Sequence, residues 1–229
     1  MTNERVIEAV VFDMDGLILD TEPIYKTAWQ SGCRDLGYEL DDATYSQLVG
    51  RPTIACEQVL LERLGSAFPL ERFRQLWPAI WQAVVSSRGI RQKPGLSALL
   101  ALLRSRNVPA AVATSSEADF TDLSLNRAGL WNVFQAIVTG DQIERGKPAP
   151  DIYLAAAAKL GVRPDRCVAL EDSESGAVAA STAGMVTLLV PDWVVPSQVA
   201  RQAATEVFPS LVEANAYIEA RLSVANSAG

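Results

Sequence analysis

Five short apolar runs divide the chain, and each is followed within two residues by a polar residue. Both alternating positions of each run are apolar, which is typical of a strand that is covered by helices on both faces of its sheet. The runs span residues 6–12, 108–113, 133–138, 167–170 and 186–190. The pattern therefore predicts buried, parallel strands.

Helical spacing fills the segments between these runs. In segment 95–105 the residues Leu96, Leu99 and Leu103 recur on one stripe. Further helices are predicted at 119–128, at 151–160 before Gly161, and at 174–183 before Gly184. Alternating strands and helices predict an α/β fold, with a doubly wound parallel sheet and right-handed crossovers.

One long segment departs from this alternation. Residues 21–90 show helical periodicity and no convincing strand. A helical insert after the first strand is the simplest interpretation. We therefore expect a Rossmann-like core formed by residues 1–20 and 91–229, and an all-helical cap domain formed by residues 21–90.

Charge and cysteine content narrow the possible partners. The formal net charge is −7 and the pI is about 4.7, and without a basic run the chain is a poor candidate for binding nucleic acid or an anionic membrane. Its three cysteines are widely spaced, as expected for reduced thiols in a cytoplasmic protein. No signal-peptide core or membrane-length apolar run is visible. A small molecule is the expected partner, and a monomer is the default expectation.

Histidine is absent from all 229 residues. This excludes a Ser-His-Asp triad, a Cys-His pair and HExxH zinc chemistry. Any acid–base catalysis near neutral pH must therefore use carboxylates, lysine, tyrosine or cysteine.

Polar residues of chemical interest follow the predicted strands. Asp13, Thr114 and Asp172 lie at strand ends, and Lys147 lies in the loop Gly146–Pro150 after the third run. Taken singly, each is more often a turn former, a helix cap or a surface lysine. Because ligands bind outside the carboxyl ends of parallel strands, we expect these four residues to meet at one edge of the sheet.

The order of these motifs resembles a known family. The run DMDG at Asp13, a hydroxyl at Thr114, Lys147 in GKPAP and the pair Glu171-Asp172 resemble the haloacid dehalogenase superfamily. The longer runs DMDGLILDTEP and GKPAPDIY are similar to its β-phosphoglucomutase-like group of small phosphatases and mutases, and the resemblance covers nearly the whole chain. It implies a Mg²⁺-dependent phosphatase that hydrolyses a small phosphate monoester, such as a sugar phosphate, through an aspartyl-phosphate.

The resemblance also implies roles for the acidic residues. Asp13 is the expected nucleophile, and Asp15 is the expected general acid and base. The expected Mg²⁺ ligands are Asp13, the backbone carbonyl of Asp15, and Asp172, with Glu171 in reach through a water molecule.

Other residues of the same motifs are expected to bind the phosphate. By resemblance, Lys147 supplies a positive charge to the phosphate, and Thr114 holds its non-bridging oxygens. Backbone N–H groups near Met14, Asp15 and Ser115 complete this set.

Two cap residues have open interpretations. The turn 20–23 is typical of a helix N-cap with proline in the first turn, yet related phosphatases place this acidic turn facing the site, with Glu22 as the residue for substrate contact. Arg51, in a segment similar to a loop that closes over substrate, is a candidate for a second anionic group or an ordinary surface arginine.

Several alternatives remain beside the phosphatase. Sugar phosphomutases of this group carry a histidine twelve residues past the nucleophile, where this chain has Tyr25. Dehalogenases and phosphonatases lack the second aspartate, which here is Asp15. A phospho-acceptor signalling module would be shorter and would have no cap, and an inactive homologue would not need the intact motif set.

Overall fold

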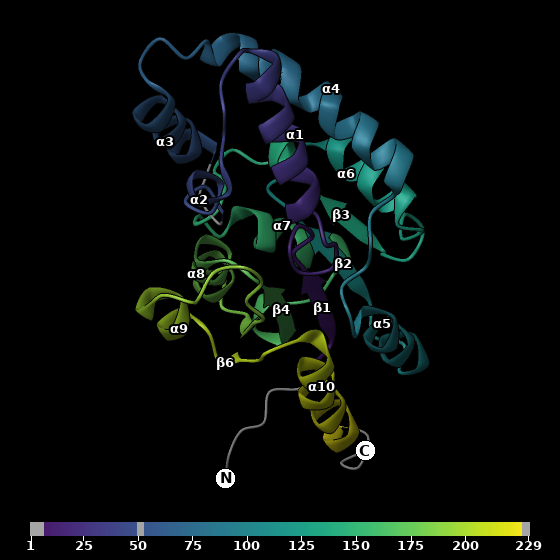
Figure 1. The fold of residues 1–229 in the computed structure, drawn as a ribbon. Helices are drawn as coiled ribbons and strands as arrows, with labels where there is room; N and C mark the ends of the chain where they lie inside the picture. Colours follow the sequence, from purple (N-terminus) through teal and green to yellow (C-terminus); the bar gives the residue numbers. More distant parts are fainter. Residues whose placement is uncertain (1–6, 50–52, 226–229) are drawn as a thin grey trace. The chain divides into compact units, whose positions relative to one another are not determined.

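The computed structural model describes residues 7–49 and 53–225 of the chain, and it divides into two compact units. One unit contains the described residues of Met1–Asp20 and Gln92–Gly229, and the other contains those of Thr21–Arg91 (Figure 1). The helical unit thus ends at Arg91, one residue beyond the segment expected from the sequence pattern.

A six-stranded parallel sheet forms the centre of the larger unit, with the strand order β3-β2-β1-β4-β5-β6 (Figure 1). The strands are β1 (Ala9–Phe12), β2 (Ala110–Ala113), β3 (Ala136–Val138), β4 (Cys167–Glu171), β5 (Val186–Leu189) and β6 (Glu206–Val207). This topology confirms the predicted fold class. The first five strands lie within or overlap the predicted apolar runs, whereas the two-residue β6 was not predicted.

Helices connect the strands and cover the sheet. They are α5 (Leu96–Ser105), α6 (Ala118–Arg127), α7 (Asp151–Leu160), α8 (Glu174–Thr182), α9 (Gln198–Ala203) and α10 (Leu211–Ala225), with short 3-10 turns at Gly140–Gln142 and Pro164–Arg166. On one face, Tyr153 and Ala156 of α7 and Ala180 of α8 pack against Val11 and Ala111 of the sheet. The alternate strand residues are also buried, as for Phe12, whose ring packs edge-on against Phe134 at 5.8 Å. Burial on both faces explains the continuous apolar runs.

The position of β1 determines where the sheet can bind a ligand. Phe12 of β1 is in register with Val112 of β2 on one side and with Leu170 of β4 on the other. The chain proceeds from β1 toward β2 and β3, and then returns to β4 on the opposite side, so the strand order reverses at β1. Crevices at such a switch point, outside the carboxyl ends of the strands, are the usual ligand sites of parallel sheets.

The smaller unit consists of α1 (Glu22–Asp35), α2 (Asp42–Tyr45), α3 (Thr53–Leu64) and α4 (Leu70–Arg88), and no strand occurs among its described residues. Aromatic side chains join α1 to α4. Trp29 meets Phe73 edge-on at 5.3 Å, and Trp81 is completely buried. The insert therefore has an aromatic core of its own.

The start of α1 corrects one detail of the sequence prediction. Pro23 lies in the first helical turn, as expected, and Thr21 is the N-cap residue. However, the Thr21 side chain makes no capping hydrogen bond, because its backbone (φ −89°, ψ −22°) is helical rather than extended. Over the part of the chain that is described, no helix combines the length and the apolar character that a membrane crossing requires.

Candidate active site

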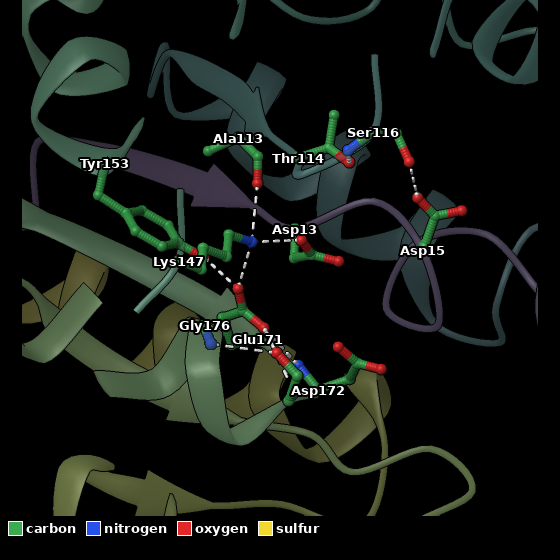
Figure 2. A network of polar contacts seen from close by, with 11 residues as sticks. Asp13, Asp15, Ala113, Thr114, Ser116, Lys147, Tyr153, Glu171, Asp172 and Gly176 are labelled. Atoms are coloured by element: carbon green, nitrogen blue, oxygen red, sulfur yellow. Dashed lines mark hydrogen bonds and ion pairs between the residues drawn. The ribbon is translucent and has the colours of Figure 1, made fainter. Parts of the chain in front are cut away.

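Lys147 lies at the centre of a buried cluster at the carboxyl ends of β1, β2 and β4 (Figure 2). Its ammonium Nζ lies 2.5 Å from Asp13 Oδ1 and 2.5 Å from Glu171 Oε1, and it donates to the Ala113 carbonyl at 3.1 Å. Only 4% of the Lys147 side chain is exposed. Burial lowers the pKa of Lys147, but the carboxylates of Asp13 and Glu171 outweigh this and raise it above its ordinary value. Lys147 is therefore a permanent cation.

Glu171 anchors this lysine. Its Oε1 also accepts a hydrogen bond from the Tyr153 hydroxyl at 2.5 Å, while its Oε2 accepts from the Ser173 hydroxyl at 3.0 Å and from the Asp172 N–H at 3.1 Å. A Cβ atom on Gly176 would lie 1.8 Å from Glu171 Oε1, so only glycine fits there. The Glu171 carboxylate is completely buried and held from several sides.

Carboxyl groups outnumber ammonium groups in the cluster. Asp13, Glu171 and Asp172 each place a carboxylate oxygen within 4.8 Å of the others. Burial raises the pKa of Asp13 to about 8, with Glu171 adding to the rise and Lys147 opposing it. Burial, followed by the charge of Asp13, raises the pKa of Asp172 well above its usual range. Three carboxylates beside one lysine form a donor set that fits a divalent, oxygen-preferring cation.

The Asp172 carboxylate lies against the backbone of Gly16, in the turn after β1. Gly16 adopts φ +82°, and a Cβ atom there would lie 2.3 Å from Asp172 Oδ2 and 3.4 Å from Asp192 Oδ2. The carboxylates of Asp172 and Asp192 therefore face the same point above Gly16. Lys93 Nζ lies 2.5 Å from Asp192 Oδ1 and partly offsets this additional charge.

Asp15 lies on the side of Asp13 away from Lys147 (Figure 2). Its Oδ2 accepts a hydrogen bond from the Ser116 hydroxyl at 2.7 Å. Thr114 is buried, its N–H continues the sheet by donating to the Val138 carbonyl at 3.0 Å, and its hydroxyl accepts from the Ser116 N–H at 3.1 Å. The loop after β2 thus contacts the turn after β1.

The structure places the other predicted residues as follows. The Met14 side chain is completely buried, and its carbonyl accepts from the backbone N–H groups of Ile18 and Leu19. Ser115 follows Thr114 and is exposed. Glu22 belongs to the helical unit, where it accepts a hydrogen bond at 2.7 Å from the hydroxyl of buried Tyr45. Arg51 lies outside the described residues.

Sequence reasoning missed three contributors to this site. Ser116 lies two residues after Thr114 and bonds to Asp15, and Tyr153 bonds to Glu171 with its ring 5.2 Å from Lys147 Nζ. Asp192 reaches the Gly16 turn from the loop after β5. Two signals were available: Asp192 follows an apolar run, and Tyr153 is the last residue of the run GKPAPDIY. Ser116 carried no signal in a single sequence, because serine is common in loops.

Comparison with known proteins identifies the family. A family model described as haloacid dehalogenase-like hydrolase matches residues 7–184. The chain is 34% identical over 179 residues to a phosphorylated carbohydrates phosphatase from Thermotoga maritima, with 78% of this chain and 82% of that protein covered. The chain therefore belongs to the haloacid dehalogenase-like hydrolases, as its motifs predicted.

Two further relatives extend the comparison. The fructose-1-phosphate phosphatase YqaB of Escherichia coli is 34% identical over 177 residues, which cover 77% of this chain and 92% of that protein. The crystal structure of CbbY from Rhodobacter sphaeroides in complex with phosphate superimposes with a TM-score of 0.77 at 26% identity, and covers 91% of this chain and 96% of that one. Family and fold are thus consistent across sequence and structure.

Proposed function

We propose that this chain is a Mg²⁺-dependent phosphatase that hydrolyses a small phosphate monoester through an aspartyl-phosphate on Asp13. The observation that carries the proposal is the position of Lys147 between Asp13 and Glu171, with Asp172 adjacent, at the switch point of the sheet. A buried carboxylate paired with a buried ammonium is a nucleophile that can accept a phosphoryl group. The names of the phosphatase relatives support the same reaction.

The chain's own residues provide for phosphate binding. Lys147 supplies a fixed positive charge beside the attacking oxygen of Asp13. The Thr114 hydroxyl, together with backbone N–H groups of Met14, Asp15 and Ser115, is proposed to hold the non-bridging oxygens. These groups come from the turns after β1 and β2, and the Ser116 contact to Asp15 links the two turns.

Asp13 and Asp15 have different roles in the proposed reaction. Asp13 attacks phosphorus, the bond from phosphorus to the leaving oxygen breaks, and its electron pair goes to that oxygen. Asp15, in its protonated form, gives its proton to the leaving oxygen. In the second half, Asp15 takes a proton from water as the water attacks phosphorus, and the bond between Asp13 and phosphorus breaks. Ionised Asp13, protonated Asp15 and inorganic phosphate result.

Asp13, Asp172 and the backbone carbonyl of Asp15 are the proposed ligands of Mg²⁺, with Glu171 in support. When bound, the ion offsets the repulsion between the carboxylates and the phosphate. It would also oppose the burial and the charge of Glu171, which raise the pKa of Asp13. Glu171 already accepts hydrogen bonds on both of its oxygens, which favours the supporting role over direct coordination.

A small sugar phosphate is the proposed substrate class. The support is the agreement of two relatives, one named for phosphorylated carbohydrates and one for fructose 1-phosphate. We propose that the helical unit acts as a cap that determines which ester is accepted, with Glu22 and Arg51 as its candidate polar contacts.

A hexose-phosphate mutase is the second candidate, because it would share the whole core. Tyr25 occupies the position at which mutases of this group carry a histidine. Its ring packs in the helical unit at 6.1 Å from the ring of Trp77 and at 5.7 Å from that of Trp81. Tyr25 is partly buried, and the absence of histidine from the chain disfavours the mutase.

Hydrolysis of p-nitrophenyl phosphate tests the proposal. With Mg²⁺, the wild-type protein should release p-nitrophenol, and Asp13→Asn should reduce kcat by at least about a thousandfold, because an amide oxygen is a very poor nucleophile. Asp151→Asn is a matched control, since that aspartate lies at the start of α7 with its carboxylate on Arg145. Full activity in Asp13→Asn would contradict the proposal.

A further inference from the structure

Ser116 is held firmly although it lies in a loop. Its N–H donates to the Thr114 hydroxyl at 3.1 Å, and its carbonyl accepts from the Gly140 N–H at 2.9 Å. These two contacts fix the backbone of Ser116 and therefore the direction of its Cα–Cβ bond. The hydroxyl points to Asp15 Oδ2, at 2.7 Å (Figure 2).

Lys147 holds carboxylates other than that of Asp15. The ammonium of Lys147 binds Asp13 and Glu171, on the other side of Asp13 (Figure 2). An aspartate side chain has three staggered χ1 positions, and proton transfer works only when the carboxyl group lies within hydrogen-bond distance of the reacting oxygen. The bond from the Ser116 hydroxyl stabilises one of these positions.

We propose that Ser116 is a positioning residue that holds Asp15 for proton transfer to the leaving oxygen. The inference rests on the proposed function and deepens it, because it names the group that aims the general acid. Ser116 would bond to neither phosphorus nor the metal, so it acts only through the proton transfers of Asp15, and kcat/KM reports the first of them, in which Asp15 gives its proton to the leaving oxygen.

The more basic the leaving oxygen is, the more the rate of ester cleavage depends on the proton that Asp15 gives. A p-nitrophenolate leaves readily without a proton, whereas phenolate is more basic and depends more on the acid. Loss of Ser116 should therefore harm phenyl phosphate more than p-nitrophenyl phosphate, although the two esters have nearly the same shape. A merely structural defect would lower both rates by the same factor.

The experiment measures kcat/KM for both esters with Mg²⁺, because this constant includes the step in which the ester bond breaks. For Ser116→Ala we expect a loss of at least about tenfold with phenyl phosphate and less than about threefold with p-nitrophenyl phosphate. Ser116→Thr keeps a hydroxyl and should restore both constants to within about threefold of wild type. Ser105→Ala removes an exposed hydroxyl at the end of α5 and should change neither.

Three outcomes would overturn the inference. They are equal losses for the two esters in Ser116→Ala, no loss for either ester, and a Ser116→Thr variant as selective as Ser116→Ala. Circular dichroism shows whether Ser116→Ala folds. If it does not, Ser116→Cys, which keeps a weak donor, is measured with both esters instead, and its selectivity is interpreted in the same way. A wild-type protein that hydrolyses neither ester would instead overturn the proposed function itself.

Discussion

Tyr153 shows how single side chains hold the charged cluster together. Its hydroxyl donates to Glu171 Oε1 at 2.5 Å, and its ring lies 5.2 Å from Lys147 Nζ. The side chain is completely buried in α7, where burial, followed by the charge of Glu171, raises its pKa well above the usual value. Tyr153 is therefore a neutral donor that satisfies a buried carboxylate and presents an aromatic face to a cation.

Tyr153→Phe separates these two contributions. The ring contact with Lys147 remains, but Glu171 loses one of its donors, and we expect the free energy of unfolding to fall by about 1–2 kcal/mol. Urea unfolding measures this. Tyr38→Phe is the matched control, because the Tyr38 hydroxyl donates at the exposed surface, to the Ala67 carbonyl at 3.2 Å. Equal losses in the two variants would show that the bond to Glu171 adds no stability.

For single residues, the sequence indicated the charged residues of the site but not the side chains that hydrogen-bond to them. Asp13, Thr114, Lys147 and Asp172 could be found because each follows an apolar run or lies in a recognisable loop, and the structure brings all four to one end of the sheet. Ser116 could not be found, because its value depends on a contact with a residue 101 positions away. Such contacts follow from strand register, which one sequence does not specify in advance.

Among the elements, the loops after β1 and β5 and the segment before α5 form a unit beside the cluster. The Lys93 N–H donates to the Ile18 carbonyl at 2.9 Å, and its ammonium lies 2.5 Å from Asp192 Oδ1. The side chains of Lys93 and Asp192 are 21% and 14% exposed. Because Asp192 also faces the Gly16 turn near Asp172, Lys93 offsets a carboxylate that would otherwise repel its neighbour.

Substitutions at this pair should have unequal effects on stability. Lys93→Met leaves Asp192 unpaired next to Asp172, and we expect it to lower the free energy of unfolding by about 2–3 kcal/mol. Asp192→Asn removes that repulsion together with the bond and should cost about 1 kcal/mol or less. The double variant should therefore be more stable than Lys93→Met alone.

The exposed pair Arg163–Asp165 is the control for these measurements, since its side chains are 77% and 46% exposed and Arg163→Met should cost less than about 0.5 kcal/mol. A Lys93→Met variant as stable as Arg163→Met would contradict the argument. So would a double variant less stable than Lys93→Met.

Element boundaries were predictable where hydrophobic periodicity was strong and unpredictable where it was weak. Segment 151–160 was predicted as a helix and forms α7 (Asp151–Leu160), closed by Gly161 in the left-handed conformation. The run 133–138 contributes only the three residues of β3, and β6 has two, because edge strands need less apolar sequence. Helix α10 (Leu211–Ala225) went unpredicted, because exposed apolar residues such as Val212 and Ala216 obscure the helical spacing of its buried residues, which are Leu211, Ala214, Ile218 and Leu222.

For the whole molecule, the excess of buried carboxylates links folding to the proposed metal. The carboxyl groups of Asp13, Glu171 and Asp172 lie close together. The Lys147 ammonium contacts two of them, those of Asp13 and Glu171. Burying like charges costs free energy, and a ligand that binds only the folded state returns some of it. Binding of the proposed Mg²⁺ at the cluster would therefore make the stability of the larger unit depend on the Mg²⁺ concentration.

Mg²⁺ should therefore raise the thermal unfolding temperature of the wild-type protein. At a concentration about a hundred times Kd, binding adds about 2.7 kcal/mol, which corresponds to a rise of about 5–10 °C for a chain of this size.

Asp172→Asn should change both the stability without Mg²⁺ and the response to Mg²⁺. Without Mg²⁺ it should be at least as stable as wild type, because one repelling charge is gone, and with Mg²⁺ its unfolding temperature should barely change. Asp151→Asn, outside the cluster, should respond to Mg²⁺ as the wild type does. A wild-type protein that does not respond to Mg²⁺, or an Asp172→Asn variant that responds fully, would contradict the assignment of the ion to this cluster.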